Sequence, residues 1–356
     1  MKAFHGPLNP AGIAGILSQA ERELGIHSIS YCLPQIYAGH QADRSIKKLG
    51  YRHLSARMEL LKFFLQEGWQ FDVFHFHFGQ SLTLTQLWDV PILNILGKSI
   101  FFYFHGCDIR DSKRVISKYT INACREHWPM TCSPIRQKSL DCATKYAKRI
   151  FVSTPDLVEF IPGSEWLPQP IAADRFLRDS IQSDEMRIRK PAVTIVHAPT
   201  NRMIKGTVYL EKAIKHLQED HFPVKLILVE NMPYDEALQV YKTSDIVVDQ
   251  LLIGAYGQLS IEAMALGKPV VCYIRDDLRE YYPQNLPIIS ATPHNIEAEL
   301  KKLIVNRESW SEYALNGRDY VKHVHESKII AQKTIYWYMK CENKNPGSIS
   351  HILKAS

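Results

Sequence analysis

The stretch Asp245–Tyr273, DIVVDQLLIGAYGQLSIEAMALGKPVVCY, decides the fold of this chain. Its pattern predicts a buried strand at residues 246–248, a glycine-bearing loop at Gly254–Gln258, a helix over Ser260–Leu266 and another buried strand at residues 270–273. Backbone amides at the N-terminus of such a helix are a ready site for a phosphate group. The stretch therefore predicts a strand–loop–helix–strand unit whose loop can hold an anion.

The same alternation extends through both halves of the chain. The N-terminal half has strand patterns at residues 2–5, 28–32, 71–78, 99–104 and 150–152, and helix patterns at residues 13–24, 55–67 and 81–88. The C-terminal half has strand patterns at residues 193–197, 225–230 and 286–290, and helix patterns at residues 206–218, 234–243, 295–305, 310–323 and 327–339. This alternation predicts an α/β fold with two Rossmann-like, parallel-sheet domains facing a central cleft.

A polar, charged stretch at residues 178–190 is typical of a linker. We therefore expect an N-terminal domain over residues 1–180 and a C-terminal domain over residues 181–325. Residues 326–356 are expected to form a helix that crosses back to the N-terminal domain, followed by a polar tail.

Composition excludes several classes of protein. The chain has 356 residues, 46% of them apolar, and a formal net charge of +6. Basic residues gather at residues 44–62 and 136–149, where they form either a solvated face or a surface for anionic lipid headgroups or an anionic acceptor. No recognition motif for nucleic acid is present, and no apolar run reaches the length of a membrane span. Any membrane contact is expected to be peripheral.

The seven cysteines are scattered, which does not indicate a disulfide framework. The spacings of Cys124, His127, Cys132 and Cys142 fit no standard pair of zinc ligands. We therefore expect reduced cysteines, no bound metal, and a cytoplasmic protein that can reach the inner face of the membrane.

Two sets of side chains could bind a nucleotide. Arg202 and Lys205 lie three residues apart in the loop after residues 193–197, where a guanidinium fork and a point charge suit a diphosphate. The alternative is a loop with exposed bases. Glu262 could accept hydrogen bonds from a ribose diol, or it could be a carboxylate favoured by the helix dipole.

His105 follows the aromatic strand SIFFYF and precedes Gly106. It could donate a hydrogen bond to a sugar hydroxyl or a phosphate, or it could be a core histidine satisfied by the backbone. Asp108 and Arg110 could pair with each other. His75 and His77 lie on one face of a strand and, without a third ligand, are interpreted as packing residues near the cleft.

Four segments together resemble the retaining glycosyltransferases of family four, which have the GT-B fold. The segments are YGQLSIEAMALGKPVV, NRMIKGT, HGCDIR, and STPDLVEF followed by WLPQPI, and they occur in the order and spacing of those enzymes. The resemblance extends from Met1 to about His325. It implies that the N-terminal domain over residues 1–180 binds the acceptor and that the C-terminal domain over residues 181–325 binds the nucleotide-sugar. It implies transfer of a sugar from a nucleotide-diphosphate sugar, a UDP- or GDP-sugar, to a glycan or lipid-linked acceptor, as in polysaccharide biosynthesis. Configuration would be retained, without a cofactor or an essential metal.

The resemblance also assigns roles to residues. Lys205 would hold the diphosphate, Glu262 the ribose hydroxyls, and His105 would contact the transferred sugar, with Arg202 completing the catalytic set. The donor-binding set is Gly12, Asn201, Arg202, Lys205, Gly254, Tyr256, Gly257, Gln258, Leu259 and Glu262. The acceptor-side set is Asn9, His77, Asp108 and Arg110.

The chain departs from the family at two positions. A second glutamate usually stands before the helix glutamate, with seven residues between the two, where this chain has Gly254. The phosphate arginine usually stands where this chain has Pro199, so Arg202 would take that role from a nearer position. Alternatives to a transferase are an epimerase or phosphorylase of the same fold, or a non-catalytic protein that binds a nucleotide-sugar.

Overall fold

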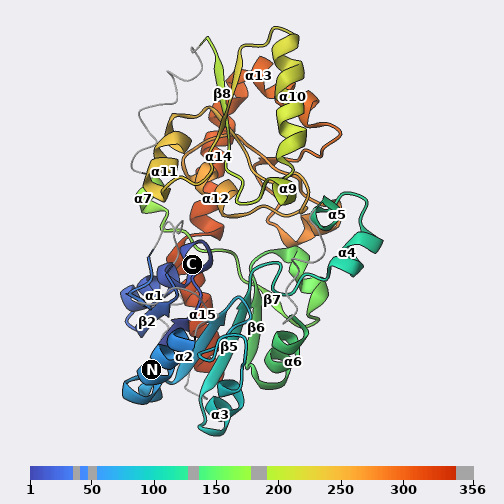
Figure 1. Cartoon of the computed structure of the whole chain (residues 1–356). Coiled ribbons are helices and arrows are strands. Elements are labelled where there is room, and N and C mark those ends of the chain that lie inside the picture. Colours follow the sequence, from blue (N-terminus) through green and yellow to red (C-terminus); the bar gives the residue numbers. More distant parts are fainter. Residues whose placement is uncertain (35–40, 47–53, 127–135, 178–190, 342–356) are drawn as a thin grey trace. The chain divides into compact units, whose positions relative to one another are not determined.

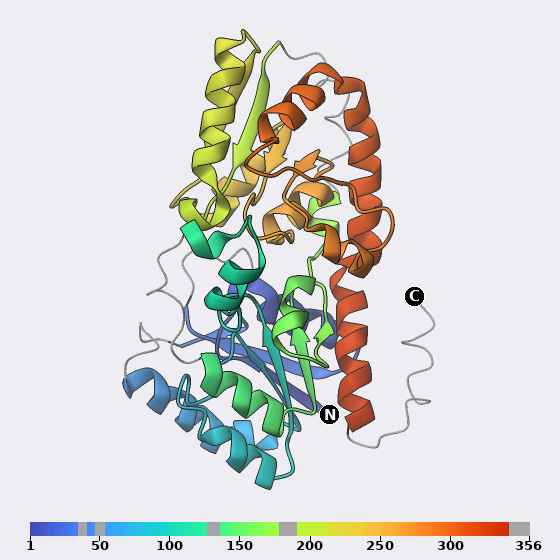
Figure 2. The ribbon, with the colours of Figure 1, turned by 90° about the vertical axis from the view of Figure 1, so that its right-hand side faces the viewer.

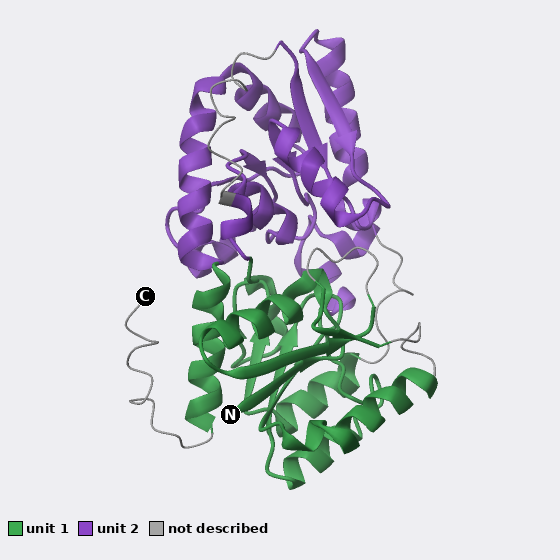
Figure 3. Ribbon diagram, turned by 90° about the vertical axis from the view of Figure 1, so that its left-hand side faces the viewer, with its two compact units in different colours: residues 1–110, 132–171, 326–356 green, residues 111–131, 172–325 purple. Residues whose placement is uncertain are grey.

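The computed structural model describes residues 1–34, 41–46, 54–126, 136–177 and 191–341 (Figure 1). The predicted linker at residues 178–190, the expected boundary at 180/181, part of the basic stretch 44–62, His127, Cys132 and the tail after Cys341 all lie outside the described residues. The chain divides into two compact units (Figure 3). Unit 1 contains Met1–Arg110, Cys132–Ile171 and the chain from Glu326 onward, whereas unit 2 contains Asp111–Thr131 and Ala172–His325.

The described strands of unit 1 form a wholly parallel sheet in the order β3-β2-β1-β4-β5-β6-β7. Its strands are β1 (Lys2–Gly6), β2 (His27–Cys32), β3 (Arg44–Ser45), β4 (Val73–His77), β5 (Ser99–Phe104), β6 (Arg149–Val152) and β7 (Glu165–Trp166). In such doubly wound sheets, ligands bind beyond the carboxyl ends of the strands where the strand order reverses. In unit 1 this point lies between β1 and β4.

Helices cover both faces of this sheet because its central strands are apolar on both sides. The helices of unit 1 are α1 (Ile13–Glu23), α2 (Leu54–Gln66), α3 (Asp89–Ile95), α6 (Arg136–Tyr146) and α15 (Ser327–Cys341). One face, carrying Phe74, Phe76 and Phe102, packs against α2, α3 and α6. The other, carrying Phe101 and Tyr103, packs against α1 and α15. Figure 2 shows α15 lying along the sheet of unit 1.

The described strands of unit 2 also form a parallel sheet, in the order β12-β11-β10-β8-β9. They are β8 (Val193–His197), β9 (Val224–Leu228), β10 (Ile246–Val248), β11 (Val270–Val271) and β12 (Ile288–Ile289). Read from β9, this is the flavodoxin-like order, which reverses between β8 and β10. The prediction of two parallel α/β sheets is confirmed.

The helices of unit 2 are α4 (Ser112–Lys118), α5 (Ala123–Glu126), α7 (Asp174–Leu177), α9 (Arg202–Lys205), α10 (Thr207–Glu219), α11 (Tyr234–Thr243), α12 (Gln258–Ala265), α13 (Ile296–Val305) and α14 (Trp310–Val324). Leucine and isoleucine side chains of α10 and α13 pack on one face of β8 and β10 in a single apolar cluster. On α14, Gly317 allows the helix to approach α12 closely, since a Cβ there would lie 3.1 Å from the Met264 carbonyl oxygen.

One predicted helix is wrong. Residues 81–88 form turns in which Leu84 and Leu87 have positive φ angles, and α3 begins only at Asp89. The Asp89 carboxylate accepts hydrogen bonds from the backbone N–H groups of Leu82 and Thr83. Side-chain bonds of this kind compete with helical backbone bonds, and here they fold the chain back before the helix starts.

Candidate functional site

The loop after β8 carries the two predicted cations. Asn201 begins α9 by accepting hydrogen bonds from the backbone N–H groups of Met203 and Ile204, so its side-chain oxygen serves as a helix cap. Gly206 ends α9 in a left-handed conformation with φ +76°. A Cβ at Gly206 would lie 3.2 Å from Leu251 and Leu252, so glycine allows the loop to pack closely against the segment after β10, where Leu251 N donates to the Lys205 carbonyl oxygen.

Lys205 reaches from this loop to the end of β10. Its Nζ lies 2.9 Å from Asp249 Oδ1 and 2.7 Å from Gln250 Oε1, and its side chain is 15% exposed. The ammonium therefore lies at the point where the strand order of unit 2 reverses. The structure brings Lys205 together with the glycine loop that the sequence predicted as the anion site.

Asp249 connects the two loops. Its Oδ2 accepts hydrogen bonds from Gly257 N at 3.0 Å and from Ser260 Oγ at 2.8 Å, while Oδ1 pairs with Lys205. Burial would raise the pKa of Asp249, but the Lys205 ammonium and these hydrogen bonds outweigh burial and hold the pKa below its usual value. The carboxylate thus fixes both the cation and the start of α12.

The N-terminus of α12 faces the same region. Gly257 is its N-cap, and a Cβ at Gly257 would lie 3.7 Å from Lys205 Nζ. The Gly257 amide is already bonded to Asp249. Gln258 and Leu259 are partly buried first-turn residues, and the first N–H groups of a helix have no partner within the helix. The partial positive charge of the helix end adds to that of Lys205.

Glu262 lies one turn farther along α12 and is 6% exposed. Its Oε1 accepts a hydrogen bond from Tyr234 Oη at 2.9 Å. Burial raises the pKa of Glu262 to about 7, and hydrogen bonds from Tyr234 and Gln258 offset only part of that effect. This carboxyl group therefore changes charge near neutral pH.

Gly254 has a structural reason to be glycine. Its φ is +85°, and a Cβ there would lie 2.5 Å from Cγ of Arg275. The Arg275 side chain pairs with Asp277 at 2.7 Å and stacks on the ring of Tyr119 at 3.8 Å. A glutamate at position 254 would be strained and would collide with Arg275, so this departure from the family pattern is built into the local fold.

Two other predicted donor residues are engaged within unit 2. The Tyr256 hydroxyl lies 3.0 Å from Tyr320 Oη and 2.9 Å from His325 Nε2, so the ring is directed into the core. Arg202 pairs with Glu211 and lies 3.7 Å from Glu230, with its side chain 47% exposed. Lys205 reaches the end of β10, whereas the Arg202 guanidinium lies beside the carboxylates of Glu211 and Glu230.

In unit 1, the loop after β1 holds the predicted Asn9 and Gly12. Asn9 Oδ1 accepts a hydrogen bond from Gly15 N at 3.1 Å, and the Gly12 N–H donates to the Asn9 carbonyl oxygen. Gly12 is the N-cap of α1 with φ +81°. This loop follows β1 and therefore lies at the point where the strand order of unit 1 reverses.

His105 and Asp108 meet at the end of β5. Asp108 accepts hydrogen bonds from the backbone N–H groups of His105 and Gly106, and burial raises its pKa to about 6. Arg110 donates instead to Asp156 Oδ2 at 2.6 Å. The expected Asp108–Arg110 pair is thus replaced by two separate anchors that fix the loop backbone around His105.

His77, predicted on the acceptor side, is fully buried behind His105. Its Nδ1 lies 3.3 Å from His105 Nε2, and its Nε2 lies 3.2 Å from His5 Nδ1. Both ring nitrogens are therefore used inside the protein. Among the described residues, no group of three or more His, Cys, Asp or Glu side chains is placed to hold a metal ion.

Sequence reasoning missed several residues of these sites. Asp249, Gln250 and Tyr234 contact predicted residues from other elements, and His5 and Glu21 lie behind His77. Asp249 could have been identified from the sequence, because it follows a predicted buried strand and precedes a candidate phosphate loop. The others depend on which elements neighbour each other in space.

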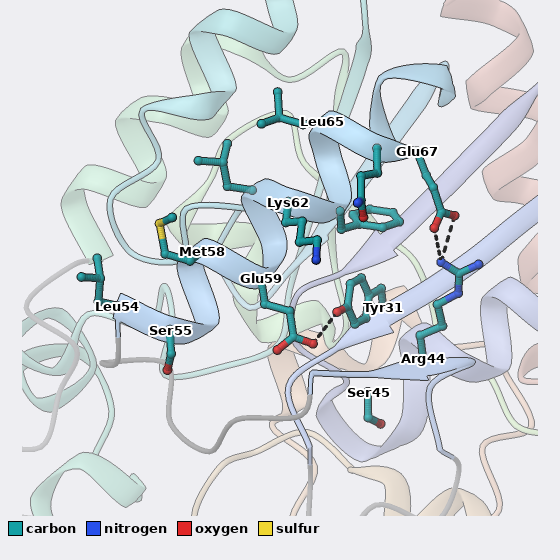
Figure 4. A pocket seen from close by; sticks show the side chains of 13 residues that line it. Tyr31, Arg44, Ser45, Leu54, Ser55, Met58, Glu59, Lys62, Leu65 and Glu67 are labelled. Atoms are coloured by element: carbon teal, nitrogen blue, oxygen red, sulfur yellow. Dashed lines mark hydrogen bonds and ion pairs between the residues drawn. The ribbon is translucent and has the colours of Figure 1, made fainter.

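A separate hollow lies on unit 1 between α2 and the β2–β3 edge (Figure 4). Leu54, Met58 and Leu65 of α2 line it and are 72%, 56% and 68% exposed. In Figure 4, the Arg44–Glu67 pair bounds this apolar surface. None of the described helices combines the length and the apolar character that a membrane span requires.

No protein-family model matches the chain, and no curated protein sequence matches it either. Solved structures do match. Sucrose-phosphate synthase from Thermosynechococcus elongatus has a TM-score of 0.66 at 14% identity, covering 97% of this chain and 99% of that one. HepE from Anabaena, in complex with UDP and glucose, has a TM-score of 0.60 at 12% identity, covering 94% and 98%.

A third match is the UDP-GlcNAc 2-epimerase from Neisseria meningitidis bound to UDP-GlcNAc, with a TM-score of 0.54 at 14% identity, covering 95% of this chain and 99% of that one. These similarities establish the fold. The chain has the GT-B fold, which glycosyltransferases and nucleotide-sugar epimerases share.

We predict that Glu262→Gln changes how stability depends on pH. Since the folded-state pKa is raised from 4.5 to about 7, the folded protein binds this proton more tightly than the unfolded chain. The contribution of the Glu262 proton to the free energy of unfolding is therefore complete below pH 4.5. It is lost as pH rises through 7, and the loss is about 3 kcal/mol in total. Urea unfolding of wild type and variant across this range should show that difference.

The control is Glu236→Gln, which removes an exposed carboxylate from α11. Its unfolding free energy should follow the wild-type pH curve. Parallel curves for wild type and Glu262→Gln would show that the pKa of Glu262 is not raised in the folded protein.

Proposed function

We propose that this protein is a glycosyltransferase that moves a sugar from a nucleotide-diphosphate sugar to a glycan or lipid-linked acceptor. The observation that carries the proposal is the convergence of Lys205, Asp249 and the N-terminus of α12 between β8 and β10, with Glu262 one turn away. A cation, the amides of a helix N-terminus and a carboxylate one turn along the helix suit a diphosphate followed by a ribose. The fold shared with HepE, whose structure contains UDP and glucose, supports a UDP-sugar as donor, with a GDP-sugar as the alternative.

Unit 2 would act on the leaving group. Lys205 and the amides of Gln258 and Leu259 stabilise the charge that develops on the departing diphosphate, and the dipole of α12 adds to this effect. Asp249 keeps the ammonium in place before the donor binds. Arg202 pairs with Glu211, whereas Lys205 lies at the end of β10, so Lys205 is the principal cation of the proposed mechanism.

Glu262 would hold the ribose. Its ionised carboxylate would accept hydrogen bonds from the two ribose hydroxyls. It already accepts a hydrogen bond from the Tyr234 hydroxyl. Because its pKa is about 7 in the folded protein, nucleotide binding favours the ionised form and becomes stronger as pH rises through that value.

Unit 1 would carry the acceptor side and the residue near the reacting carbon. His105 contacts the transferred sugar, and Asn9, Gly12 and Asp108 shape the surrounding loops. We propose retention of configuration, in which an oxygen of the departing donor takes the acceptor proton on the same face. The two proposed domains therefore divide the reaction, with the donor on the C-terminal side and the acceptor on the N-terminal side.

An epimerase is the second candidate, because the Neisseria epimerase matches nearly the whole chain in fold. The two activities differ in whether an acceptor is needed. Proton NMR of a donor with the protein alone separates them, since an epimerase interconverts the sugar without an acceptor. A transferase leaves the donor unchanged until an acceptor is added.

A thermal-shift screen of UDP-, GDP-, ADP- and CMP-sugars identifies the class of nucleotide-sugar that the protein binds. We expect one nucleotide class to raise the melting temperature, with UDP-sugars first, because a ligand that binds the folded state stabilises it. A chain that responds to none of the four classes would contradict the proposed function.

We predict that Lys205→Ala weakens binding of the nucleoside diphosphate by about tenfold or more, the worth of one charge-assisted hydrogen bond. Isothermal titration calorimetry measures this. Lys215→Ala, which removes a 75% exposed lysine from α10, is the control and should bind as wild type. Circular dichroism checks that both variants fold. Unchanged affinity in Lys205→Ala for every nucleoside diphosphate would refute the assignment.

We also propose that α2 contacts an anionic membrane surface at the cytoplasmic face. Leu54, Met58 and Leu65 expose apolar area beside Lys62, a combination typical of interfacial helices. The wild type should sediment with vesicles that contain phosphatidylserine, whereas the double variant Met58→Ser/Leu65→Ser should stay in the supernatant. Vesicles of neutral lipid alone are the control. Equal sedimentation of the two proteins with anionic vesicles would refute this contact.

A further inference from the structure

The carboxyl ends of β4, β5 and β6 in unit 1 carry buried polar atoms without hydrogen bonds. These five atoms, here called the polar row, are Gln80 Oε1, His105 Nδ1, Ser153 Oγ, Thr154 Oγ1 and Asp156 Oδ1, and none has a partner among the described residues. Ser153 and Asp156 are each only 2% exposed. An unpaired buried polar atom costs free energy, so such atoms are normally bonded to an ordered water or to a ligand.

The members of the polar row come from three neighbouring strands. In the sheet of unit 1, β5 lies between β4 and β6. Gln80 follows β4, His105 follows β5, and the other three residues follow β6. Neighbouring strands lie about 4.8 Å apart, so the polar row extends over about 10 Å at one edge of the sheet. This width accommodates more than one sugar ring.

His105 and Ser153 are neighbours on one face of the sheet. The Ser153 N–H donates to the Phe104 carbonyl oxygen at 2.9 Å, so the ladder between β5 and β6 continues to the residues just beyond them. Because side chains alternate along a strand, His105 shares a face with Tyr103, and Ser153 shares one with Phe151. Tyr103 and Phe151 belong to the same apolar cluster. The two side chains therefore lie side by side where this face ends.

The charges around the polar row disfavour an anionic ligand. Arg110, in the same loop as His105, donates to Asp156 Oδ2 at 2.6 Å, so the nearby guanidinium already faces a carboxylate of the protein. The oxygens of Asp156 and the amide oxygen of Gln80 accept hydrogen bonds and cannot donate them. A phosphate or carboxylate ligand at neutral pH also only accepts. It would leave these oxygens unpaired and would be repelled by Asp156.

A sugar hydroxyl suits every member of the polar row. A hydroxyl donates one hydrogen bond and accepts others, so it can donate to Gln80 Oε1 or Asp156 Oδ1. With the hydroxyls of Ser153 and Thr154 it can pair in either direction. It can also pair with His105 Nδ1 whether that nitrogen carries a hydrogen or a lone pair. The match therefore does not depend on the tautomer or the charge of the ring.

We propose that the polar row is a subsite of unit 1 for a neutral glycan, whose hydroxyl groups complete the missing hydrogen bonds. The inference rests on the proposed function for the role of this glycan, which is the acceptor. The part of the acceptor bound here is then uncharged sugar and not the phosphate of a lipid carrier. Polar groups kept for a ligand lower the stability of the free protein, as is common at functional sites.

The first test measures stability without any ligand. Ser153→Ala and Thr154→Val each remove one hydroxyl of the polar row with little change in shape. Since neither hydroxyl has a partner within the described protein, neither change should lower the melting temperature measured by differential scanning fluorimetry. A lower melting temperature in either variant would show that its hydroxyl is bonded inside the protein, and would overturn the proposal.

The second test identifies the ligand on an array of neutral, uronic-acid-containing and phosphorylated oligosaccharides, without any nucleotide. Neutral oligosaccharides should retain the wild type. In an NMR titration with the best of them, Ser153→Ala and Thr154→Val should bind about tenfold more weakly, the worth of one hydrogen bond. Retention by charged oligosaccharides only, retention by none, or wild-type affinity in both variants would overturn the proposal.

The matched control is Ser164→Ala. Ser164 Oγ is also buried without a partner among the described residues, but Ser164 precedes β7 and so lies at the amino end of its strand. This variant should bind the oligosaccharide as the wild type does, and an equal loss of affinity would contradict the assigned position of the subsite. Failure of the proposed function is distinguishable, because a protein that binds the neutral glycan but no nucleotide-sugar keeps the subsite and loses the transferase assignment.

Discussion

The ion pair between Lys205 and Asp249 is the interaction on which the site in unit 2 depends. It joins the loop after β8 to the end of β10, at the point where the strand order of the sheet reverses. The same carboxylate fixes Gly257 and Ser260, and so aims the N-terminus of α12. A fully buried Asp249 is tolerated because each of its oxygens is paired. The cation and the helix end are thereby held together before any ligand arrives.

Unit 1 uses a comparable device with different chemistry. A buried carboxylate, Glu21, bonds His5 at one end of a chain of three histidines that ends at His105. In both units a buried carboxylate lies behind the residues of the proposed site, bonded to Lys205 in unit 2 and to His5 in unit 1. Both anions stay ionised for the same reason, since their bonded partners outweigh the cost of burial.

The sequence was informative wherever a structure depends on neighbouring residues. Periodicity located α10, α11, α13, α14 and α15 within one or two residues, because apolar spacing alone decides such helices. It failed at residues 81–88, where Asp89 binds the preceding backbone. The sequence also suggested that Asp108 could pair with Arg110, since it could not show that Asp156, 46 residues away, bonds the guanidinium. Asp249, Tyr234 and Glu21 were missed for the same reason, as their roles follow from strand order and helix packing.

The central claim is that a nucleoside diphosphate binds at the strand-order reversal of unit 2. A crystal structure of the protein with UDP tests this most directly. The account predicts the β-phosphate within hydrogen-bond distance of Lys205 Nζ and of the first amides of α12, with the ribose hydroxyls on Glu262. A nucleotide bound elsewhere on the chain, or bound here with its phosphates turned away from Lys205, would contradict it.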